Sequence, residues 1–89
     1  MKTTLSNTLH LATFIDIVSI QKNPETKKDS AIIRLNLYGN IILVNVPEEI
    51  IPIILALDSG DELLVLLKKT IKNEYFLYGI QLLNFSLYN

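Results

Sequence analysis

The chain has 89 residues, no cysteine and a formal net charge of −1, with 49% hydrophobic and 19% charged residues. This length predicts one domain over residues 1–89, and the apolar content excludes a disordered chain. The lack of cysteine excludes a disulfide framework and a thiolate metal site, and the near-neutral charge does not by itself indicate a nucleic-acid binder.

The N-terminal residues 1–14 contain one lysine but lack the continuous apolar segment and the small-residue cleavage site of a signal peptide. The longest apolar runs, IIPIILAL and LLVLL, are far shorter than the roughly 20 residues that a membrane-spanning helix needs. We therefore expect a cytoplasmic protein without a membrane segment.

Residues 9–20 are rich in β-branched and aromatic side chains and predict a long first strand. Its two apolar sets differ in phase, which indicates a bend or bulge. Residues 21–30 predict a polar loop, and residues 31–38 and 41–46 predict a hairpin joined by Gly39 and Asn40. In its first strand, Ile33, Leu35 and Leu37 form a core stripe. The opposite face carries Ile32, Arg34, Asn36 and Tyr38.

The segment that begins at Pro47 breaks the strand pattern and predicts a short helix. Glu48 and Glu49 suit a helix N-terminus, and the following isoleucines have helical spacing. Pro52 disfavours a continuous helix, so we expect a short or broken helix that starts again at Pro52. Residues 62–69 and 75–85 predict the fourth and fifth strands.

The order of strand, strand, strand, short helix, strand, strand resembles the OB-fold. Gly60 and Asp61 before ELLVLL are similar to the start of the fourth strand in many OB domains, and Gly79 is similar to a small residue often found in the fifth. The resemblance implies an all-β, five-stranded antiparallel OB-fold barrel with a short helix between strands 3 and 4. An SH3-like or Sm-like small barrel is the alternative, although its helix usually lies elsewhere in the chain.

In OB domains, the face of strands two and three and the two flanking loops hold oligonucleotides or oligosaccharides. Seven of the eight basic residues lie in the predicted loops or on that face, and acids gather between residues 48 and 62. We therefore predict a nucleic-acid site formed by Lys22, Lys27, Lys28, Arg34, Asn36, Tyr38, Lys68, Lys69, Lys72 and Tyr75. Solvation alone also explains lysines in loops, and lysines at strand edges also prevent aggregation. A tyrosine here can stack on a base or fill the core.

Little in the sequence indicates an enzyme. His10 is the single histidine, and no cluster with metal-ligand spacing, nucleophile elbow or phosphate loop is visible. We expect no catalysis, no cofactor and no bound metal.

The resemblance implies a single-stranded DNA-binding protein that binds with little sequence preference, as a homo-oligomer; the sequence itself does not separate DNA from RNA. The chain ends in NFSLYN, unlike the acidic tail of bacterial single-strand binding proteins. A binder without that tail would suit a replication accessory of a phage or other mobile element. The alternative is a protein-interaction or assembly module that does not bind nucleic acid and uses exposed apolar residues such as Ile32, Ile41 and Leu43.

Overall fold

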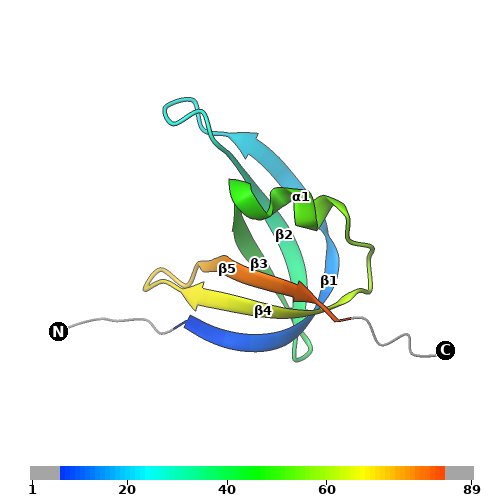
Figure 1. Ribbon diagram of the computed structural model, residues 1–89. Helices are drawn as coiled ribbons and strands as arrows, with labels where there is room; N and C mark the ends of the chain where they lie inside the picture. The colour runs from blue at the N-terminus through cyan, green and yellow to red at the C-terminus, as the bar shows by residue number, and fades with distance from the viewer. Residues whose placement is uncertain (1–6, 84–89) are drawn as a thin grey trace.

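The computed structural model describes residues 7–83. It contains five strands, one 3₁₀ turn and one short helix (Figure 1): β1 (Asn7–Lys22), β2 (Asp29–Leu37), β3 (Asn40–Pro47), η1 (Glu48–Ile50), α1 (Ile51–Leu55), β4 (Glu62–Lys69) and β5 (Tyr75–Leu82). The predicted element order is confirmed. The fifth strand was expected to reach residue 85, whereas β5 ends at Leu82 and residues 84–85 lie outside the described part.

The strands close into a barrel in the order β1-β2-β3-β5-β4, with β4 paired back to β1. This confirms the predicted five-stranded barrel with its short helix between strands 3 and 4. The expectation of an antiparallel barrel is wrong at one pair, because β3 and β5 are parallel at Val44↔Tyr75 and Asn45↔Phe76. The reason is geometric, since a closed ring with an odd number of strands cannot alternate direction throughout.

The first strand changes partner along its length. Its first half pairs with β4 and its second half with β2, and Thr13 is in register with both Glu62 and Asn36. The predicted irregularity is confirmed by register shifts between Phe14 and Asp16 and between Ile17 and Ser19. Each shift changes which residues face inward. Before the first shift, Ala12 and Phe14 are buried and Leu9 and Leu11 point to the outside, whereas beyond it Ile17 packs against the core.

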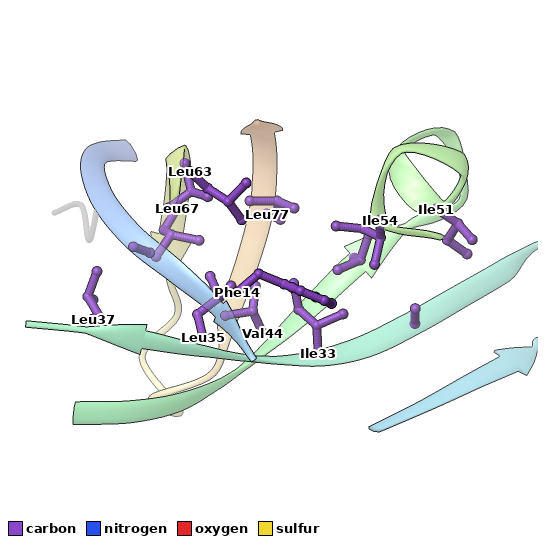
Figure 2. Close-up of a cluster of buried hydrophobic side chains, with 14 residues drawn as sticks. Phe14, Ile33, Leu35, Leu37, Val44, Ile51, Ile54, Leu63, Leu67 and Leu77 are labelled. Carbon is purple, nitrogen blue, oxygen red and sulfur yellow. The ribbon is translucent and has the colours of Figure 1, made fainter. Parts of the chain in front are cut away.

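Alternating residues of every strand fill the barrel. Ile33, Leu35 and Leu37 are buried as predicted, together with alternate residues of β3 and β4. Figure 2 shows Phe14 amid this cluster, with Ile51 and Ile54 of α1 at one end and Leu37 at the other. The helix therefore closes one end of the barrel with apolar side chains.

The broken helix is also confirmed. Pro47 precedes η1, Glu48 and Glu49 occupy its first turn, and Pro52 lies in the first turn of α1, where its missing N–H has no intrahelical partner to lose. Within residues 7–83, no helix has the length and apolar character needed to cross a membrane.

Phe14 fills the core at the point where β1 changes its partner strand, so we expect its side chain to contribute strongly to the stability of the fold. We expect Phe14→Ala to lower the free energy of unfolding by about 3–5 kcal/mol, because it leaves a cavity in the core. Ile71→Ala, in the exposed turn after β4, should change it by less than about 0.5 kcal/mol. Urea unfolding followed by circular dichroism measures both, and equal losses would contradict the assigned core.

Candidate nucleic-acid interface

The ten predicted site residues fall into three places. One group surrounds the β1–β2 turn, the second lies on β2 or just after it, and the third surrounds the β4–β5 turn. These groups are, in that order, Lys22, Lys27 and Lys28; Arg34, Asn36 and Tyr38; and Lys68, Lys69, Lys72 and Tyr75. Both turns project toward the left side of Figure 1.

The β1–β2 turn is held by Asn23. Its Oδ1 accepts hydrogen bonds from the backbone N–H groups of Glu25, at 2.8 Å, and Thr26, at 3.2 Å. Its backbone N–H and C=O bond to Lys28 and Lys27, and Lys27 has a positive φ of 64°. Lys27 and Lys28 are therefore held out into solvent on an ordered turn.

Lys22 is less available than the sequence suggests. Its Nζ lies 3.4 Å from Oδ1 of Asp29, its register partner across the β1–β2 ladder. Both side chains are partly exposed, so water screens this pair and its strength is small. The pair nevertheless reduces the positive charge at the base of the turn.

The β4–β5 turn is built in a similar way around Thr70. Its Oγ1 accepts hydrogen bonds from the backbone N–H groups of Lys72, at 3.2 Å, and Glu74, at 3.3 Å. Asn73 takes the left-handed conformation, with φ of 64°. Lys72 is exposed on this turn, and Nζ of Lys69 lies 5.6 Å from the ring centre of Tyr75.

Arg34 is already paired within the protein. Its Nε donates to Oδ1 of Asp16 at 2.8 Å, and its Nη2 donates to Oδ2, so the contact is bidentate. The hydrogen bond from Arg34, supported by its positive charge, lowers the pKa of Asp16, and the carboxylate raises the pKa of Arg34. Asp16 was missed because the bulge after Phe14, which sequence cannot place exactly to the residue, brings it into register with Arg34.

Asn36 and Tyr38 have local roles at the β2–β3 hairpin. Asn36 Oδ1 accepts a hydrogen bond from the Gly39 N–H at 2.8 Å, which stabilises the turn. Tyr38 lies beyond the end of β2, with φ of 54°, and its ring is edge-on to His10 with 5.7 Å between the ring centres. Its hydroxyl lies 3.2 Å from His10 Nδ1. The strand alternation that grouped Tyr38 with Arg34 therefore stops at Leu37.

Of the three aromatic residues on β5, Phe76 and Tyr78 face outward and Tyr75 does not. Tyr75 is half-buried against the core, whereas Phe76 is in register with Asn45, between the buried Val44 and Val46, and so lies on the outer face. A register shift opposite Leu66 and Leu67 inserts Tyr78 as an extra residue, which is 53% exposed. Phe76 and Tyr78 nevertheless line one hollow, and Lys68, the register partner of Phe76, approaches the Tyr78 ring, so the two rings share a side that we call the aromatic face.

The aromatic face borders two adjoining hollows on the outside of the barrel. One, of about 250 Å³, is lined by Ser30, Asn45, Pro47, Phe76 and Tyr78, among others. The other, of about 300 Å³, is lined by Pro47, Glu49, Ile50 and Tyr78. The smaller one equals the volume of roughly eight liquid waters. Asn45 is fixed at the edge, because its Nδ2 donates to the Tyr75 carbonyl at 3.1 Å.

The outer face of β2 and β3 is more apolar than its polar residues suggest. Leu43 and Ile41 are exposed, and they are in register with Arg34 and Asn36, while Ile32 is half-buried beside Asn45. This face therefore offers a hydrophobic surface with one internally paired arginine. The strongest concentration of rings and lysines lies one strand further on, where Nζ of Lys68 is 5.7 Å from the ring centre of Tyr78.

Within residues 7–83, no group of three or more histidine, aspartate or glutamate side chains is arranged to hold a metal ion. Comparison of the chain with protein-family models, with curated proteins and with solved structures finds no match.

The Asp16–Arg34 pair gives a titration that can be measured. We expect the Asp16 carboxyl to titrate below its ordinary value of about 3.9, and Arg34→Gln should return it toward that value. Since the folded pKa is lowered, the stability that this pair contributes is present above the ordinary pKa and is lost as the pH falls through the lowered one. Carbon-detected NMR measures the Asp16 titration in the wild type and in the Arg34→Gln variant. A normal Asp16 titration in the wild type, or an equal change in Lys22→Gln, would contradict the pairing.

Proposed function

We propose that the chain binds single-stranded DNA with little sequence preference, along a path from the β4–β5 turn across the aromatic face. The observation that carries the proposal is Tyr78, an exposed ring that borders two hollows and lies beside the ammonium group of Lys68. Proteins of this kind combine rings on which bases stack with a positive path for the phosphates.

The rings supply contacts that do not depend on base identity. Every base has a flat aromatic face, and stacking on a protein ring contributes about 1–3 kcal/mol per base. Phe76 and Tyr78 lie close together on one strand, so successive bases can lie against β5. Both hollows beside Pro47 are lined in part by Tyr78, so a base placed in either one contacts that side chain.

The charges orient such a strand. Lys68, Lys69 and Lys72 lie at one end of the aromatic face, where phosphates are attracted. Glu49 lines the hollow at the other end. A carboxylate there repels phosphate and can accept hydrogen bonds from the N–H groups of a base. The arrangement therefore supports a strand whose phosphates follow the lysines while a base enters the hollow.

Titration of fluorescent oligo-dT tests this function directly. We expect binding that weakens as salt rises, with a slope of about −0.7 for each phosphate contacted. Tyr78→Ala should weaken binding by about tenfold or more through the lost stacking. Tyr38→Ala removes an even more exposed tyrosine (70%) at the β2–β3 hairpin and serves as the matched control.

The outcomes of this titration are distinct. No binding by the folded wild-type chain at low salt would reject the proposal. Equal losses in Tyr38→Ala and Tyr78→Ala would reject the aromatic face as the site. A parallel titration with oligo-U decides between DNA and RNA.

Asp16 provides a second and opposite test. Asp16→Asn removes the carboxylate that holds Arg34, and the released guanidinium can then pair with phosphate or stack on a base. We expect oligo-dT to bind about two- to fivefold more tightly, with a steeper salt slope. Asp58→Asn makes the same change in charge in the turn after α1 and should have a smaller effect. Equal effects would show that only net charge matters.

A second candidate function rests on the apolar outer face of β3. Ile41 and Leu43 are both exposed there, in register with Asn36 and Arg34. A protein-interaction module without nucleic-acid binding would use these residues. In that case, oligo-dT would not bind, and Leu43→Asp would abolish capture of the partner protein.

A further inference from the structure

The outer face of the β1–β4 ladder carries a compact apolar patch. Leu9 is in register with Leu66, and Leu11 is in register with Leu64, so the four leucines form two adjacent cross-strand pairs. Leu9 and Leu11 are 60% and 54% exposed, and the two leucines of β4 are half-buried. The residues between them, such as Val65 and Ala12, point into the core. We call these four residues the leucine patch.

Charged residues of opposite sign lie at the two ends of this patch. Glu62, Leu64, Leu66 and Lys68 alternate with buried residues, so β4 presents acid, leucine, leucine and base in a row on its outer face. Thr13 Oγ1 donates to Glu62 Oε2 at 3.4 Å, which joins the acidic end to β1. On the far side of β4, Gly79 is in register with Leu66 and has no side chain to cover it.

We propose that a second copy of the chain packs on the leucine patch to form a symmetric dimer. The two-fold axis lies between the two sheets, runs across the strands, and passes between Leu64 and Leu66. This rotation reverses β4, so each Leu64 lies over Leu66 of the second copy. The same operation places Glu62 of each copy opposite Lys68 of the other, so the dimer contains two such charge pairs.

The charge pattern selects this occupant and this axis. An axis parallel to the strands would place β4 over β1 of the second copy, with Lys68 and Glu62 opposite uncharged residues. Only the axis across the strands matches both charges at once, as a symmetric interface between identical surfaces requires. The leucines then supply the buried area, and the charges fix the register and exclude other alignments.

Gly79 leaves space beside Leu66 for a side chain of the second copy. A Cβ at this position would lie 3.4 Å from Cβ of Leu66, so a larger residue would fill the space beside that leucine. With glycine, the flank of Leu66 stays open to a side chain from the opposing sheet. Side chains from two sheets that pack face to face interdigitate in this way.

The dimer is tested with the protein alone, so the result does not depend on nucleic-acid binding. Lys68 is shared by both surfaces, because its ammonium group also approaches Tyr78. Glu62 lies at the opposite end of the patch and does not border the aromatic face. Failure of oligo-dT to bind would therefore leave the dimer intact, and a monomeric chain would not contradict DNA binding.

Charge reversal tests the axis. In analytical ultracentrifugation, we expect Glu62→Lys alone and Lys68→Glu alone each to raise the dimer dissociation constant by about tenfold, because like charges then face each other. An equimolar mixture of the two variants should dimerise again, since each then faces its opposite charge. The double variant should also recover. Failure of both the mixture and the double variant to recover would overturn the proposed axis.

Paired leucine variants test the patch. Leu9→Glu should dissociate the dimer, whereas Leu55→Glu, at a position that is also 60% exposed but lies on α1, should not. Circular dichroism verifies that both fold. A wild-type chain that sediments as a monomer up to roughly 0.1 mM, or equal dissociation by the two leucine variants, would overturn the proposal.

Discussion

The change of partner by β1 is the constraint on which the barrel depends. At Thr13 the strand is in register with β4 and β2 at once. Just beyond, the Phe14 N–H donates to the Asp61 carbonyl at 2.9 Å and the Phe14 carbonyl accepts from the Gly60 N–H at 2.8 Å. These bonds tie the start of β4 to the middle of β1 while the Phe14 ring fills the core. The bulge after Phe14 then places Asp16 opposite Arg34, so the ion pair on the surface depends on the same part of β1.

The described surface favours short-range contacts over a broad positive field. Arg34 is held by Asp16, Lys22 is paired with Asp29, and Glu49 lines one hollow. Positive charge is therefore concentrated at the two turns, where Lys27, Lys28 and Lys72 are exposed. Screening by salt acts over about 8–10 Å at physiological ionic strength. A ligand on this surface gains from rings nearby before it gains from distant charge.

The sequence predicted the elements well because their signals are local. Alternation identified the strands, and the two prolines correctly marked the broken helix. Site residues were harder because two bulges decide which side chains face each other. One brings Asp16 to Arg34, and another inserts Tyr78 into β5. Tyr38 was grouped with Arg34 by alternation, but a positive φ ends that alternation at the turn. Such shifts arise from tertiary pairing, which periodicity does not contain.

The parallel pairing of β3 with β5 has a consequence for motion. These strands are joined at only two register positions, Val44↔Tyr75 and Asn45↔Phe76, whereas the neighbouring ladders are much longer. Short ladders open at a lower free energy than long ones. We therefore expect the barrel to open first at this seam between β3 and β5. Asn45 and Phe76 belong to opposite sides of the seam and to the same hollow. A molecule bound in that hollow would contact both strands and hold them together. Its affinity and the rigidity of the barrel would therefore rise together.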